Sequence, residues 1–70
     1  MLIRLNDTEQ MDDLCAHYLR SGFHVEPTGD ATVEVTRRDA PTTEQERYEV
    51  LLHLRVWQVV NPGAEAELLH

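Results

Sequence analysis

The chain has 70 residues and a formal net charge of −7, from 13 acidic and 6 basic side chains. This length predicts one domain, which buries only about 60% of the surface that its unfolded chain exposes. The acidic balance argues against a nucleic-acid backbone or an anionic membrane as a partner. Cys15 is the single cysteine, so the sequence predicts neither an internal disulfide nor a zinc site built from paired cysteines.

The beginning of the chain lacks a charged segment followed by an apolar run, the pattern of a secretion signal. No run of about 18 apolar residues occurs anywhere in the sequence, so we expect no membrane span. With one unpaired cysteine, the expected location is the cytoplasm.

Residues 1–5 alternate in side-chain direction and predict a short strand. Residues 8–20 predict a helix, because their apolar residues recur at three- and four-residue spacing and Gly22 supplies a left-handed stop. This helix has one apolar stripe, made of Met11, Leu14, Cys15, Tyr18 and Leu19.

Two alternating runs, 23–26 and 32–36, flank the turn sequence Pro-Thr-Gly-Asp and predict a β-hairpin. Its apolar face carries Phe23, Val25, Val33 and Val35, whereas the opposite face is polar. We therefore expect only one side of the sheet to be covered.

Residues 42–61 predict a long helix whose apolar residues lie on two arcs. At about 100° per residue, one arc holds Tyr48, Leu52, Val56 and Val59. The opposite arc holds Val50, Leu54 and Trp57, with Leu51 to one side. A helix that is apolar on two faces is buried on two faces, so something must cover each arc.

These elements predict one α+β domain at residues 1–63, in the order β-α-β-β-α. In the expected three-stranded sheet, the strand at 32–36 lies between those at 1–5 and 23–26, with both helices on one face. This is the split β-α-β arrangement of ferredoxin-like folds. A direct parallel pairing of the first two strands stays open as an alternative. Residues 64–70 are expected to form a loosely ordered tail.

From the two arcs we predict a small, non-catalytic interaction module that forms a homodimer, or binds an unidentified protein, through the second helix. The expected interface residues are Val50, Leu54, Trp57 and Leu51, because tryptophan is enriched at interface hot spots. Two alternatives stay open. The helix can touch the sheet and the first helix at once, which needs no partner, or the chain is an accessory subunit of a larger enzyme.

Asp13 and His17 lie four residues apart on the first predicted helix and, with His24, suggest a metal or small-ligand site. This spacing is common by chance without a third fixed ligand, so we expect a solvated acidic–histidine pair and no metal site. Cys15 lies in the apolar stripe and is expected to be a buried core thiol. The sequence contains neither a glycine-rich phosphate loop nor a nucleophile–base–acid set, so we predict no cofactor and no enzymatic activity.

Overall fold

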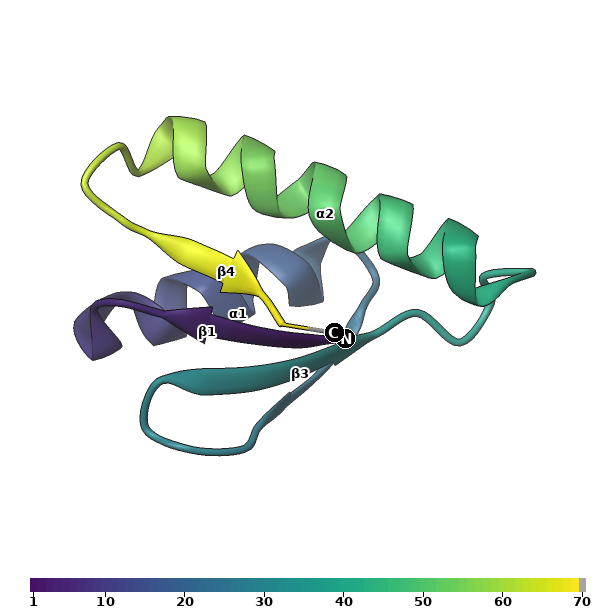
Figure 1. Ribbon diagram of the computed structural model, residues 1–70, viewed down its shortest axis with the longest axis horizontal. Helices are drawn as coiled ribbons and strands as arrows, with labels where there is room; N and C mark the ends of the chain where they lie inside the picture. The colour runs from purple at the N-terminus through teal and green to yellow at the C-terminus, as the bar shows by residue number, and fades with distance from the viewer. Residues whose placement is uncertain (70) are drawn as a thin grey trace.

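A computed structural model describes residues 1–69, and its elements follow the order β-α-β-β-α-β (Figure 1). The strands are β1 (Leu2–Leu5), β2 (His24–Pro27), β3 (Thr32–Thr36) and β4 (Ala66–Leu68). The helices are α1 (Met11–Arg20), which follows the 3-10 turn η1 (Thr8–Gln10), and α2 (Thr43–Val60).

The four strands form one antiparallel sheet in the order β2-β3-β1-β4. β3 lies between β1 and β2, as predicted, so the alternative of a direct β1–β2 pair is wrong. Because both β1 and β2 run antiparallel to β3, they are parallel to each other across it. With β4 beside β1, the order is that of the complete ferredoxin-like arrangement.

The prediction of three strands and a loosely ordered tail was wrong. Ala66–Leu68 pairs with β1 in the register Ile3↔Leu68 and Leu5↔Ala66. Backbone hydrogen bonds from Asn6 to Glu65 and from Leu69 to Leu2 extend this pairing at both ends. The segment is too short and too poor in β-branched residues to show a strand pattern of its own, and the free edge of β1 supplies the order. His70, the last residue of the predicted tail, lies outside the described residues.

The start of α2 and the end of α1 each have a local cause in the sequence. Thr42 caps α2, because its side-chain oxygen accepts a 3.0 Å hydrogen bond from the backbone N–H of Gln45. Gly22 follows α1 with φ of 89°, a left-handed conformation that other residues adopt at a cost. These local signals set where α2 begins and where α1 ends, and packing decides which face of each helix is covered.

Both helices cover the same face of the sheet, as predicted, and the core lies between the two layers. Alternate strand residues point into it, so that Ile3 and Leu5 of β1 and Val33 and Val35 of β3 are buried while Arg4 is exposed. The buried core consists of Ile3, Leu5, Met11, Leu14, Tyr18, Phe23, Val33, Val35, Val50, Leu54, Trp57 and Ala64. The opposite face of the sheet is left without a covering layer in residues 1–69 (Figure 1).

Candidate functional site

The residues expected to form the interface face the core. Val50, Leu54 and Trp57 are 0%, 2% and 2% exposed, and Leu51 is half-buried. The sheet and α1 cover this arc within the single chain, so the alternative that needs no partner is correct for it. Placing the interface on these residues was therefore wrong, and their burial needs no second copy.

The opposite arc of α2 is the one left exposed. Tyr48, Leu52, Val56, Val59 and Val60 form what we call the outer stripe, with exposed fractions between 47% and 80%. They lie at three- and four-residue spacing and extend about 18 Å along the helix, at about 1.5 Å per residue. No other element of residues 1–69 contributes as many exposed large apolar side chains.

The geometry of α2 explains why one arc is covered and the other is not. Leu52 lies about 200° around the helix from Leu54, at about 100° per residue, so these two leucines point in opposite directions. Leu54 points toward the sheet, and consequently Leu52 points away from it. α1 lies beside α2, with Asp13 hydrogen-bonded to Trp57, so it does not cover the outer stripe either.

The outer stripe is locally neutral in an acidic protein. Residues 48–64 contain one acidic residue, Glu49, and one basic residue, Arg55, so their charges cancel while the whole chain carries −7. A neutral apolar surface can contact another copy of itself without strong repulsion at the contact.

The two edges of the sheet are less suited to binding another strand. Pro27 ends β2 and lacks the N–H that a neighbouring strand would use. At β4, the side-chain amide of Gln58 donates a 3.2 Å hydrogen bond to the carbonyl of Ala66. Because α2 occupies this hydrogen-bonding group, β4 offers a shortened edge, and the outer stripe is the better candidate for a contact surface.

Leu19 is also exposed, at 59%, but it is separate from the outer stripe. On α1, Asp13 and His17 face α2, through a hydrogen bond to Trp57 and a ring contact with His53. Leu19 lies about 160° from His17 around the helix axis, on the side away from α2.

The predicted ligand set of Asp13, His17 and His24 does not assemble. The carboxylate of Asp13 accepts a 2.8 Å hydrogen bond from the indole N–H of Trp57. His17 faces His53, and His24 lies exposed on β2. Within residues 1–69, no group of three histidine, cysteine or acidic side chains could hold a metal ion. The i, i+4 spacing of Asp13 and His17 is therefore explained by two separate contacts with α2.

Sequence reasoning did not find the aromatic cluster that joins the two helices. The rings of His17 and His53 lie 5.5 Å apart, and Phe23 meets His53 edge-on at 5.2 Å. Burial lowers the pKa of His17, and the neighbouring His53 lowers it further. The buried Nε2 of His17 has no hydrogen-bond partner in the part of the chain described. In the sequence, the one indication of this cluster is that His17 and His53 each lie next to an apolar arc of their helix.

Cys15 is half-buried and packs against the core from α1. Burial raises the pKa of its thiol, and the nearby carboxylate of Asp12 raises it further. A nucleophilic cysteine needs the opposite shift, because the thiolate is the reactive form. The side chain is less buried than predicted, and its environment suits a packing role.

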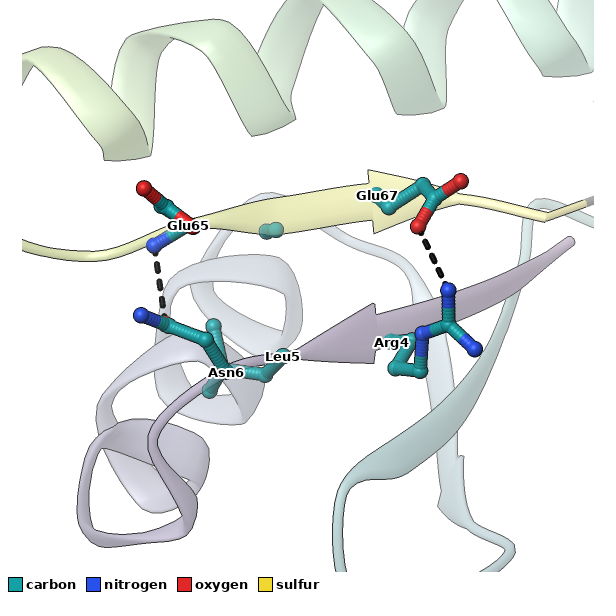
Figure 2. Close-up of a pocket in the computed structure, with 6 residues that line it drawn as sticks. Arg4, Leu5, Asn6, Glu65 and Glu67 are labelled. Atoms are coloured by element: carbon teal, nitrogen blue, oxygen red, sulfur yellow. Dashed lines mark hydrogen bonds and ion pairs between the residues drawn. The ribbon is translucent and has the colours of Figure 1, made fainter.

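A shallow hollow of about 260 Å³ lies where β1 meets β4 (Figure 2). Its polar groups already bind one another: Arg4 Nη2 lies 2.7 Å from Glu67 Oε2, and Asn6 Oδ1 accepts a 2.8 Å hydrogen bond from the N–H of Glu65. Since ligand sites rest on a few polar groups that converge on a concave space, this self-paired hollow is a poor candidate.

No protein-family model, no curated protein and no solved structure matches the chain. In the described part of the chain, neither helix combines the length and the apolar character that a membrane crossing requires.

Proposed function

We propose that the chain is a small, non-catalytic, cytoplasmic interaction module that forms a homodimer through the outer stripe of α2. The observation that carries this proposal is the exposure of five large apolar side chains on one helix face, opposite a face that is fully buried. Contiguous exposed apolar surface is typical of protein–protein contact sites. The single unpaired Cys15 favours a reducing compartment.

A second copy is the partner that the composition of the stripe favours. Under a twofold axis the same patch meets itself, and an apolar, locally neutral patch is complementary to itself. A domain of this size without a disulfide also gains stability from association. Residues 48–64 carry no net charge that would attract a highly charged partner.

The expected affinity is moderate. Full burial of one large aliphatic side chain contributes about 1.5–3 kcal/mol, and the five stripe residues on each copy are partly exposed to begin with. Their combined contribution is on the order of 10–20 kcal/mol, against an association cost of about 4–15 kcal/mol. At the middle of both ranges, about 15 against about 10 kcal/mol, the balance of about 5 kcal/mol corresponds to a dissociation constant on the order of 100 µM.

Sedimentation equilibrium from about 5 µM to about 500 µM tests the proposal, since this range spans a dissociation constant on the order of 100 µM. The wild-type chain should shift from monomer to dimer with concentration, and Leu52→Glu should remain a monomer throughout. Leu19→Glu is the matched control, because it makes the same change at an exposed leucine outside the stripe and should leave dimerisation unaltered.

Two results would reject the homodimer. One is a wild-type chain that stays monomeric at the highest concentration. The stripe would then bind a different protein, such as a larger enzyme of which this chain is an accessory subunit. The other is a dimer that tolerates Leu52→Glu, which would move the interface elsewhere.

A further inference from the structure

The charges on α2 are distributed unevenly along its length. Glu44, Glu46 and Glu49 lie in the N-terminal half, and Arg47 and Arg55 are the basic residues of the helix. From Val56 to Ala64 the sequence carries no charged side chain. The N-terminal half of α2 therefore has a formal charge of −2, partly offset by Arg37, whose Nε lies 3.8 Å from Glu49 Oε2, whereas the C-terminal end is neutral.

We propose that the two copies cross with their α2 helices antiparallel, so that Leu52 of each copy lies against Val56 of the other. This inference rests on the proposed function. A parallel pair would place two acidic N-terminal ends side by side, with like charges and aligned helix dipoles. An antiparallel pair separates these ends by nearly the length of the helix, about 27 Å for 18 residues.

The stripe itself fits this arrangement. Its ends are Tyr48 and Val60. A twofold axis near position 54 therefore places Tyr48 of one copy opposite Val60 of the other, and Leu52 of one copy opposite Val56 of the other. The large ring of Tyr48 then meets the small β-branched side chains of Val59 and Val60. Large and small residues on facing positions interdigitate well.

The same arrangement determines the shape of the dimer. α2 lies against one face of the sheet (Figure 1). Its outer stripe is exposed, on the side of the helix opposite the buried Val50, Leu54 and Trp57. In two copies joined at the stripes, the four layers stack in the order sheet, helix layer, helix layer, sheet. Both open sheet faces, with the exposed side chains of Arg4, His24 and Glu26, lie outermost and stay accessible.

Distances between spin labels distinguish the two orientations. In a Cys15→Ser background, one label is placed at Gln45 and, in a second variant, at Arg55, both of which are exposed. With the axis near position 54, the two labels at 45 are offset by about 27 Å along the helices and those at 55 by about 3 Å. The antiparallel dimer should give a distance at Gln45 longer than that at Arg55 by on the order of 15 Å.

Equal, short distances at both positions would show a parallel pair and overturn this inference while leaving the homodimer intact. Long distances at both positions in a sedimenting dimer would place the contact off the stripe and reject both proposals. Leu52→Glu added to each labelled chain should remove both distances.

Disulfide formation gives a second measurement that does not depend on a bulky label at Arg55. Mixed Tyr48→Cys and Val60→Cys chains, each in the Cys15→Ser background, should form the heterodimeric disulfide. Tyr48→Cys alone should not cross-link to itself. Efficient self-linking of Tyr48→Cys would mean that the helices run parallel.

Discussion

Tyr18 connects the two helices through its hydroxyl group, which donates a 2.7 Å hydrogen bond to the backbone carbonyl of Val50. The side chain is fully buried, and this burial raises the pKa of its phenol, so the neutral donor is the stable form. The sequence placed Tyr18 in an apolar stripe, but the acceptor lies 32 residues away on another element.

Tyr18→Phe removes this hydrogen bond and keeps the ring. We expect the free energy of unfolding to fall by about 0.5–1.5 kcal/mol, the usual net value of one hydrogen bond. Urea denaturation at low protein concentration measures it. Tyr48→Phe makes the same change at an exposed tyrosine and should have little effect. Equal losses for both variants would mean that the buried bond contributes nothing specific.

The lowered pKa of His17 predicts that the stability of the fold depends on pH. Burial, the ring of His53 and Arg20 lower its pKa below the ordinary value of 6.5, and these effects outweigh the opposing effects of the His53 backbone and the charge of Asp13. The unfolded chain therefore binds the proton more readily than the folded chain. The resulting stability is present above pH 6.5 and is lost as the pH falls through that value toward the lower folded pKa.

We predict that the urea midpoint falls between about pH 7.5 and about pH 5.5, the range in which an ordinary histidine titrates. His17→Gln should reduce this fall, because it removes the titrating group from the contact with His53. His24→Gln, at an exposed histidine of β2, should keep the wild-type fall. A pH response unchanged in His17→Gln would assign the effect to other groups.

β4 shows how a short element takes its structure from its neighbour. Leu68 packs against the core from one face of the strand, whereas Glu67 points to the other face and pairs with Arg4 in solvent. The strand is therefore held by the apolar contacts of Ala66 and Leu68, by its backbone ladder with β1 and by the hydrogen bond from Gln58 to the carbonyl of Ala66.

Leu68→Ala should lower the free energy of unfolding by about 1–2 kcal/mol, less than the 2–5 kcal/mol of a fully buried leucine because the side chain is partly exposed. Glu67→Ala, one residue earlier, should change it by less than about 1 kcal/mol, as expected for an exposed ion pair. Thermal unfolding followed by circular dichroism measures both. If both substitutions are neutral, β4 does not contribute to the cooperative fold.

Twelve of the 13 acidic residues of the molecule lie outside residues 48–64. Two copies bring together a formal charge of −14, twice the −7 of one chain, so long-range repulsion opposes association. Salt screens charges separated by more than about 10 Å at 0.1 M, whereas the apolar contact itself does not weaken.

We therefore expect the dissociation constant of the dimer to fall by a few-fold when the salt concentration rises from about 0.02 M to about 0.5 M. Sedimentation equilibrium at the two concentrations measures it, with Leu52→Glu as the monomeric reference. A dissociation constant that rises with salt would indicate that ion pairs hold the dimer, contrary to the neutral composition of residues 48–64.

Local patterns were sufficient for much of this architecture. The alternation of residues 32–36, the stripe of residues 11–19 and the stops at Gly22 and Asn61 depend on neighbours in the chain, and the structure has these elements in the predicted order. The same periodicity showed two apolar arcs on residues 42–61. It could not decide which arc faces inward, because both satisfy the helical repeat equally well.

That choice depends on contacts between distant residues. Trp57 faces inward, where its indole N–H reaches the carboxylate of Asp13, 44 residues earlier, and Val50 faces Tyr18. β4 likewise exists because β1 has a free edge for it. Burial and hydrogen-bond satisfaction are properties of the assembled layers, so the position of the exposed stripe, and with it the candidate contact surface, emerged only when the chain was folded.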